Sequence, residues 1–378
     1  MQKNILITTT YCYPYLSGLA IYPYRIAQHL AKKHKVIILT YKHNVNIKSK
    51  KKQNNLLIIR LSSHLGFLKG MVNFIYPYYA LKQVQQAEVI IVNLPQLEGI
   101  FPALWARLFN KKLYVIYHCD LQLEKSILFK LAAWTVNLSS YLTCLLSQKI
   151  ITNSQDYAQH SMVLKHFLYK TTYTFPPIKK SKVDPNYLKS LKEKYSNNSP
   201  ILGYVGRISQ EKGVEYLLQA LDHLQKDFPN YVFLIAGPSK TMGENKYRSY
   251  ILKEVERNQF NVQFLSKVNR QQLTAFYQCI DLLIIPSINK TESFGMTQIE
   301  AMLQGTPVLA SNMPGVRVAI NSTKMGLLAK PKDSQDLANK IIVVLKSPKK
   351  YQVPKKQIGQ LFNPNQTYQV FDQLIENG

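Results

Sequence analysis

Two cations stand in a short glycine-bounded stretch that follows an apolar run. Arg207 and Lys212 come after apolar residues 201–205 and before a segment, 214–224, whose apolar residues have helical spacing. This order predicts a buried strand, a loop and a helix. Backbone N–H groups and the start of a helix already favour an anion in such a loop. A planar guanidinium and a mobile ammonium together suit phosphate oxygens, so the stretch predicts a diphosphate site.

Two carboxylates, Glu292 and Glu300, stand at the mouth of a second crossover of this kind, after the apolar run 281–286. Carboxylates can hold sugar and ribose hydroxyls, so the two motifs together have the groups that a nucleotide-sugar site needs. Each carboxylate also has a structural interpretation. Glu292 fits an exposed loop residue, and Glu300 fits a capping box in which it bonds back to the backbone of Thr297.

The elements that must position these residues alternate along the whole chain. Apolar runs that predict strands occur at 5–9, 36–40, 56–61, 89–92, 113–117, 150–152, 201–205, 231–236, 262–265, 281–286, 307–311 and 327–329. Helical patterns lie between them, notably at 20–33, 67–84, 99–108, 126–146 and 335–345. This alternation predicts an α/β protein with doubly wound parallel sheets, and 378 residues suit two domains.

In this order along the chain, the motifs resemble the retaining glycosyltransferases of GT-B architecture, specifically the family 4 group (glycosyl transferases group 1). The resemblance is strongest over residues 201–328. It rests on the G-R-x-x-x-x-K-G pattern at 206–213, the Glu-x7-Glu pattern of Glu292 and Glu300, Gly305-Thr306-Pro307-Val308 and Pro314-Gly315-Val316.

The resemblance implies two Rossmann-like domains facing a cleft, and we expect four segments. They are an acceptor-binding domain at 1–178, a hinge at 179–199, a nucleotide-sugar-binding domain at 200–355, and a C-terminal segment at 356–378 whose helix returns to the first domain. The polar, proline-flanked composition of 179–199 fits the hinge, with some local helix at 187–195.

The resemblance also assigns roles to individual residues. We expect Arg207, Lys212 and Gly18 at the donor diphosphate, Glu292, Phe294, Gly295 and Met296 at the donor sugar, and Glu300 at the ribose. The catalytic set is His118, Asp120 and Glu292, and no metal is expected.

His118 and Asp120 follow the run 113–117, at the strand end where parallel sheets bind ligands. His118 would donate a hydrogen bond to a sugar hydroxyl or steady an oxocarbenium ion, and Asp120 would orient the acceptor hydroxyl or act as its base. The structural alternative is a strand-end histidine satisfied by the backbone, followed by a helix-capping aspartate.

The chain departs from the family pattern at two positions. Ser17-Gly18 stands where relatives usually have two glycines, and Lys267 stands where many have a glycine in the base-contacting loop. These changes leave the acceptor and the nucleotide base undetermined.

The net charge of +27 predicts attraction to a polyanion, either an anionic membrane or nucleic acid, although a solvated basic surface is an equally good explanation. Tyr76-Pro77-Tyr78-Tyr79, with Lys69 and Lys82 nearby, could line an acceptor groove or form an interfacial helix, with ordinary packing as the alternative. Residues 131–147 are too short and too polar for a membrane span and predict a buried amphipathic helix.

The motifs and the resemblance together imply a metal-independent transferase that moves a hexose from a UDP- or GDP-sugar to a glycan or lipid-linked acceptor, in cell-surface polysaccharide or glycolipid synthesis. The retaining course is what the resemblance implies. We expect it in the cytoplasm, peripheral on the inner face of the cytoplasmic membrane. No secretory signal opens the chain, and its four cysteines lack Cys-x-x-Cys spacing. The alternatives are a basic nucleic-acid-binding protein, which the charge alone supports, and a non-catalytic GT-B scaffold.

Overall fold

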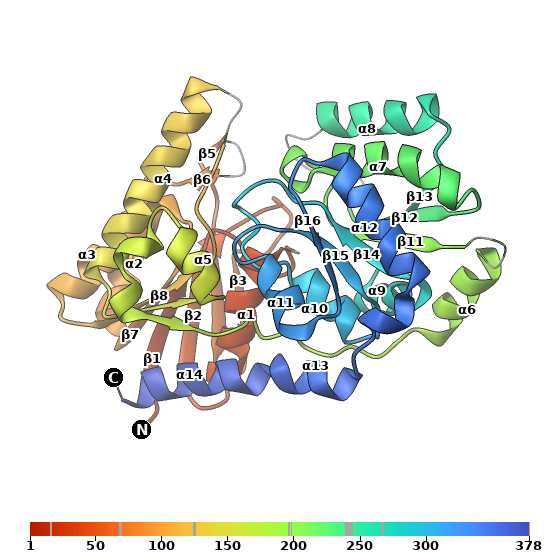
Figure 1. The fold of residues 1–378 in the computed structure, drawn as a ribbon. Helices are drawn as coiled ribbons and strands as arrows, with labels where there is room; N and C mark the ends of the chain where they lie inside the picture. Colours follow the sequence, from red (N-terminus) through yellow and green to blue (C-terminus); the bar gives the residue numbers. More distant parts are fainter. Residues whose placement is uncertain are drawn as a thin grey trace. The chain divides into compact units, whose positions relative to one another are not determined.

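The alternating apolar runs form two separate parallel sheets in the computed structural model (Figure 1). The structure describes residues 1–15, 17–67, 70–123, 126–195, 197, 199–238, 245–265 and 268–377. The chain divides into two compact units, one of Met1–Pro177 with Asn363–Gly378, and one of Ile178–Phe362. Residues 179–199, expected to be a hinge, thus lie within the second unit, and the return to the first unit comes at Asn363, later than position 356.

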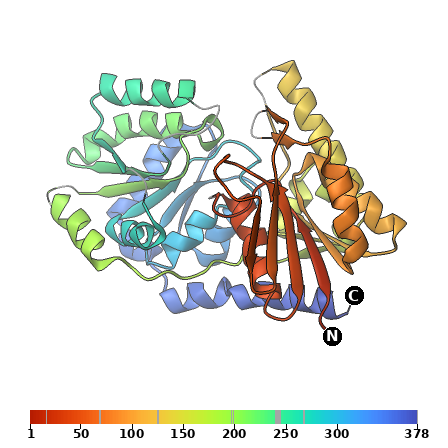
Figure 2. The ribbon, with the colours of Figure 1, turned by 180° about the vertical axis from the view of Figure 1, so that it is seen from behind.

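The first unit is built on an eight-stranded sheet in the order β10-β9-β8-β7-β1-β2-β4-β3. Its strands are β1 (Asn4–Thr8), β2 (Lys35–Tyr41), β3 (Lys50–Gln53), β4 (Leu56–Leu61), β7 (Val89–Leu94), β8 (Lys112–Tyr117), β9 (Lys149–Thr152) and β10 (Thr171–Tyr173). β1 to β4, coloured red to orange, can be followed side by side in Figure 2. A separate antiparallel pair is formed by β5 (Leu65–Phe67) and β6 (Gly70–Val72).

Helices cover both faces of this sheet, because the strand residues alternate between two apolar cores. The helices of the unit are α1 (Gly18–Leu30), α2 (Tyr76–Gln86), α3 (Ile100–Leu108), α4 (Ile127–Leu146), α5 (Gln155–His160) and α14 (Pro364–Glu376). One core joins Leu6 and Val115 to residues of α2 and α3, and the other joins Ile5 and Ile7 to residues of α1 and α14. The predicted C-terminal helix is therefore an integral part of the first unit.

Three consecutive lysines, Lys50, Lys51 and Lys52, form most of β3, a strand that the sequence patterns did not predict. β3 is the only antiparallel member of the sheet in the part that the structure describes, it lies at the sheet edge beside β4, and all four of its residues are exposed. Lysines on an edge strand discourage pairing with other chains. This position gives the run a structural explanation that needs no ligand.

The second unit has a six-stranded parallel sheet in the order β13-β12-β11-β14-β15-β16. Its strands are β11 (Ile201–Val205), β12 (Val232–Ala236), β13 (Val262–Leu265), β14 (Leu282–Ile285), β15 (Val308–Ser311) and β16 (Gly326–Ala329). Its helices are α6 (Pro185–Lys194), α7 (Val214–Asp227), α8 (Asn245–Arg257), α9 (Arg270–Cys279), α10 (Met296–Met302), α11 (Arg317–Thr323), α12 (Ser334–Lys346) and α13 (Lys355–Leu361). The predicted α/β class with two doubly wound sheets is confirmed.

Within the described ranges, no helix is both long enough and apolar enough to cross a membrane.

Candidate active site

The second sheet has one point where the direction of chain progression reverses, between β11 and β14. From β11 the chain moves outward through β12 and β13, and then returns to β14 and moves the other way through β15 and β16. Ligands of open parallel sheets bind outside the carboxyl ends of the strands at such a point. The loops after β11 and β14 carry Arg207, Lys212 and Glu292, so the structure places three predicted donor residues there.

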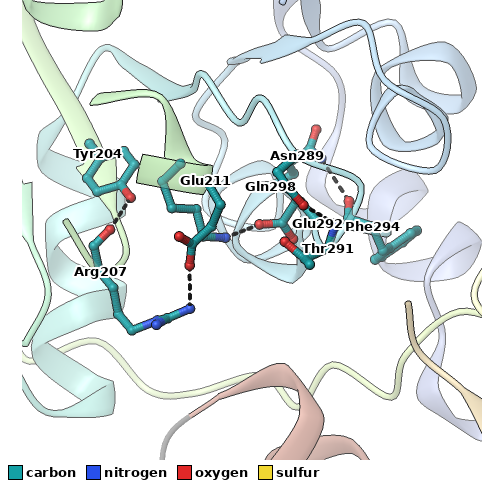
Figure 3. A network of polar contacts seen from close by, with 9 residues as sticks. Tyr204, Arg207, Glu211, Asn289, Thr291, Glu292, Phe294 and Gln298 are labelled. Atoms are coloured by element: carbon teal, nitrogen blue, oxygen red, sulfur yellow. Dashed lines mark hydrogen bonds and ion pairs between the residues drawn. The ribbon is translucent and has the colours of Figure 1, made fainter. Parts of the chain in front are cut away.

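Arg207 contacts residues of β11 and of its own loop (Figure 3). Its Nη2 donates to Glu211 Oε1 over 3.0 Å, and its carbonyl oxygen accepts from the Tyr204 hydroxyl over 2.6 Å. The side chains of Arg207 and Glu211 remain 29% and 25% exposed. The guanidinium is therefore oriented and still accessible, as a phosphate ligand must be.

Lys212 forms an ion pair with Glu292, which joins the β11 loop to the β14 loop. Both side chains are mostly buried, at 23% and 18% exposure. The Glu292 segment is turned by Asn289, whose carbonyl and side-chain oxygens accept from the N–H groups of Glu292 and Thr291, each over 3.0 Å (Figure 3). The structure thus brings the predicted diphosphate cation and the predicted sugar carboxylate into direct contact.

Gly213 explains why these two loops can lie so close. Its φ of +63° is in the left-handed region, and a side chain there would run into the Pro286 carbonyl oxygen at the end of β14. Beside it, the Ile288 N–H donates to the Glu211 carbonyl oxygen over 3.0 Å. Gly213 is therefore needed both for its backbone conformation and for its close approach to the neighbouring loop.

The predicted sugar-binding turn is built around Gly295, which precedes α10 with φ +74°. Gln298 is fully buried, and its Nε2 donates to the carbonyl oxygens of Phe294 and Val316 over 2.9 and 3.0 Å. The Phe294 ring is 2% exposed and packs edge-on against Phe362, so its side chain does not fit the expected sugar contact. Only the backbone around Phe294 and Gly295, and the partly exposed Met296 at the start of α10, suit that role.

Glu300 lies inside α10, and the capping-box interpretation is wrong. The helix begins at Met296 with Gly295 as its N-cap, so Thr297 is already inside it. Instead, the Tyr277 hydroxyl of α9 donates to Glu300 Oε2 over 3.2 Å. Burial, and then the Glu300 carboxylate, raise the pKa of Tyr277 well above its usual range, which keeps this phenol protonated as a donor. Glu300 is thus an oriented, partly exposed carboxylate, which is compatible with binding ribose.

In the first unit, His118 follows β8 and is buried. Its Nε2 lies 3.4 Å from Asn93 Oδ1, while Asn93 Nδ2 donates to the Thr8 carbonyl oxygen over 2.9 Å. This amide orientation assigns the imidazole proton to Nε2 and leaves Nδ1 as an acceptor. The Tyr22 ring of α1 packs edge-on against the imidazole, with 5.3 Å between the two ring centroids.

Burial lowers the pKa of His118 to about 3. The ring is therefore neutral at physiological pH and offers no positive charge to repel an oxocarbenium ion. With the proton on Nε2, a sugar hydroxyl that approached Nδ1 would donate to it. The contact of His118 with the donor sugar, as a hydrogen-bond donor or beside the oxocarbenium ion, stays a prediction.

Asp120 does not suit the predicted role of base for the acceptor hydroxyl. Its side chain is fully buried, and its carboxylate accepts from Tyr117 Oη over 2.6 Å, Ser161 Oγ over 2.7 Å and the Met162 N–H over 2.9 Å. Its own N–H donates to Tyr157 Oη over 2.6 Å. A carboxylate with three internal donors and no exposed surface holds β8 to the segment after α5, which is a structural role.

Gly18 is the exposed first residue of α1, directly after the loop that follows β1. It belongs with His118 to the first unit, whereas Arg207 and Glu300 belong to the second. Its predicted contact with the diphosphate stays a prediction, and Lys267 lies outside the described residues.

Five positioning residues were missed in the sequence: Glu211, Gln298, Tyr277, Asn93 and Tyr22. Only Glu211 had a usable local signal, because it lies four positions after Arg207, a spacing at which opposite charges commonly pair. The other four contact residues distant in sequence or on other elements, which no local pattern specifies.

Comparison with known proteins relates part of the second unit to a family model. Residues 189–360 match the family model described as Glycosyl transferases group 1. A D-inositol 3-phosphate glycosyltransferase of Corynebacterium urealyticum is 34% identical over 148 residues, which cover 38% of this chain and 34% of that protein. A 2-deoxystreptamine glucosyltransferase of Streptomyces kanamyceticus is 28% identical over 167 residues, or 43% of this chain and 42% of that protein. The chain thus spans between a third and a half of the length of these relatives.

Solved structures match over the full length. Anabaena HepE in complex with UDP and glucose superimposes with a TM-score of 0.79 at 18% identity, covering 100% of both chains. A sucrose-phosphate synthase from Thermosynechococcus elongatus gives 0.78 at 20% identity, again over 100% of both chains. At this identity the likeness concerns the fold, and it confirms the predicted GT-B architecture.

Proposed function

We propose that this chain, whose residues 189–360 form a glycosyl transferases group 1 domain, transfers a hexose from a nucleotide-sugar to a hydroxyl of a glycan or lipid-linked acceptor. The observation that carries the proposal is the Lys212–Glu292 ion pair, which lies where the chain reverses its direction of progression through the second sheet, between β11 and β14. It puts the cation proposed for the diphosphate next to the carboxylate proposed for the sugar, at the sheet edge where parallel sheets commonly bind nucleotides.

In this proposal, Arg207 and Lys212 neutralise the charge that develops on the departing diphosphate. Two fixed cations can supply this charge, so we propose that the reaction needs no metal. Glu292 holds hydroxyls of the sugar, and Glu300, oriented by Tyr277, holds the ribose. The stereochemical course proposed is the retaining one of family 4, with the leaving phosphate taking the acceptor proton on the same face.

The nucleotide is proposed to be UDP or GDP, and UDP is the first to test because the structurally similar HepE was crystallised with UDP-glucose. The acceptor is proposed to belong to cell-surface polysaccharide or glycolipid synthesis, at the inner face of the cytoplasmic membrane. The sequence relatives act, by their names, on inositol phosphate and 2-deoxystreptamine, so soluble polar acceptors belong in the same screen.

The test is nucleotide binding and turnover in Arg207→Ala and Lys212→Ala, with Lys253→Ala on the exposed surface of α8 as a matched control. We expect UDP to stabilise the wild type and the control by about 2.7 kcal/mol at a hundred times the dissociation constant. UDP-sugar turnover should fall about 100-fold in each site variant, the usual loss when a preorganised electrostatic contact is removed. Folded site variants with wild-type turnover would disprove the diphosphate assignment.

A further inference from the structure

Helix α4 turns most of its uncharged polar residues toward the protein. Ser139 Oγ donates to the Leu97 carbonyl oxygen over 2.6 Å, and Asn137 Nδ2 donates to the Leu121 carbonyl oxygen over 2.9 Å. Ser140 and Thr143 are buried and donate to carbonyl oxygens of their own helix. The buried amphipathic helix expected at 131–147 is thus corrected: the helix is amphipathic, but its polar face is the buried one.

The opposite face of α4 is apolar and exposed. It consists of Ile127, Leu128, Leu131, Trp134, Leu138, Leu142 and Leu145. Most of these recur at intervals of three or four residues, so they form a continuous stripe along five turns of helix. Their exposed fractions include 85% at Ile127 and 60% at Trp134. A stripe of this length is far beyond the single exposed apolar residues of an ordinary surface.

Beside α4 in the first unit, α3 packs against α4 and α2 packs against α3 (Figure 1). Phe74 and Ile75, just before α2, and Tyr78 and Leu104 within α2 and α3 are also exposed. A groove of about 420 Å³ lies among these helices and is bordered by Phe74, Leu138 and Leu142. We call the exposed residues of α4 and these four neighbours the apolar face.

The charged side chains of α2, α3 and α4 are all positive, and Glu98, which also borders the groove, is buried and accepts from the Tyr41 hydroxyl. α2, α3 and α4 contain Lys82, Arg107 and Lys130 and no acidic residue. Lys82 also lies over the Tyr78 ring, 4.9 Å from its centroid. Cations beside exposed tryptophan and tyrosine fit the headgroup region of an anionic bilayer, where aromatic rings bridge the apolar and aqueous layers. A second copy of the chain fits less well, because a symmetric dimer would bring the same cations opposite one another.

We infer that the apolar face docks on an anionic lipid bilayer, with α4 lying in the plane of the interface and its apolar stripe inserted. This gives the proposed membrane association a defined surface, different from the lysines of β3. Binding to vesicles can be measured without any transfer reaction, so its failure and that of the proposed activity are distinguishable.

The experiment measures co-flotation of the full chain with vesicles of phosphatidylcholine alone or with phosphatidylglycerol. We expect binding to the anionic vesicles only, falling with salt. Leu131→Ser and Trp134→Ser should each weaken it about tenfold, because each removes roughly one buried apolar side chain from the interface. Lys130→Gln should weaken it about fivefold, the effect expected for one near-surface cation. All three positions are exposed, so the variants should melt like the wild type.

Val343→Ser, an exposed apolar residue on α12 of the second unit, is the matched control and should bind like the wild type. The docking surface would be refuted by wild-type vesicle binding in folded Leu131→Ser and Trp134→Ser, or by binding to neither vesicle. Light scattering without lipid provides a further check. A stable dimer that these two variants convert to monomer would assign the face to a second copy and overturn the lipid assignment.

Discussion

Removing the buried imidazole of His118 should change how the stability of the first unit depends on pH. Burial lowers the pKa of His118 from its ordinary value of 6.5 to about 3. Between these values the unfolded chain binds a proton that the folded chain does not. The free energy of unfolding therefore falls as pH decreases through 6.5, and this penalty keeps growing until pH nears the folded pKa.

The size of the effect follows from the two pKa values. At about pH 5.5, one unit below the unfolded pKa, the single group lowers the free energy of unfolding by about 1.4 kcal/mol relative to a pH well above 6.5. Each further pH unit adds about the same amount. His118→Gln removes the titrating group. Between a pH well above 6.5 and about pH 5.5, the free energy of unfolding of the variant should therefore fall by about 1.4 kcal/mol less than that of the wild type, even if the variant is less stable at neutral pH.

The assay is urea unfolding at a series of pH values, with an NMR titration of the histidine ring protons to follow His118 directly. Tyr22→Phe is the control, since it alters the packing against the imidazole without removing a group that titrates in this range. We expect the His118 signal to show no titration step near 6.5. A step there, or identical pH dependence in the wild type and His118→Gln, would refute the assignment of a neutral, buried imidazole.

Two further predictions concern carboxylates. Asp120→Ala should lower the free energy of unfolding of the first unit by about 3–5 kcal/mol, because three buried donors lose their acceptor. Asp120→Asn, if folded, should retain most of the turnover, and a large loss of turnover with unchanged stability would restore the role of base. Glu300→Gln should weaken UDP affinity about tenfold, the effect of about 1.4 kcal/mol expected for a lost charge-assisted hydrogen bond. Unchanged affinity in calorimetry, with a lower melting temperature, would show that Glu300 only anchors Tyr277.

The sequence was sufficient for most strands of the two larger sheets, β3 and β10 excepted, because these strands are buried on both faces and each appears as a continuous apolar run. The run 201–205 coincides with β11, and the run 281–286 extends one residue beyond β14 at each end. β3 could not be found in this way. An edge strand of exposed lysines has no apolar run, and it forms because β4 provides a partner.

The candidate site was predictable where loops follow strands, because the carboxyl ends of parallel strands share one sheet edge. That reasoning placed Arg207, Lys212 and Glu292 correctly at one edge. The same reasoning failed for Asp120, because its three hydrogen-bond partners are set by tertiary packing. A different argument failed for α4, because helical periodicity predicts an apolar stripe but not the direction in which the stripe points. The usual assumption that an apolar stripe faces inward was wrong there.

Because α14 packs in the first unit, the first unit cannot complete its fold until the end of the chain has been synthesised. Phe371 and Ile375 lie in the same core as Ile5 and Ile7 of β1, and the Tyr114 hydroxyl donates to the Leu374 carbonyl oxygen over 3.0 Å. Residues 178–362 intervene, and at about 5–20 residues per second the ribosome needs roughly 10–40 s to add them. During that interval α14 is missing from the first unit, so one face of its sheet is incompletely covered. The unit that begins the chain is therefore the last to be completed, and a nascent chain halted within the second unit would present this open face to chaperones.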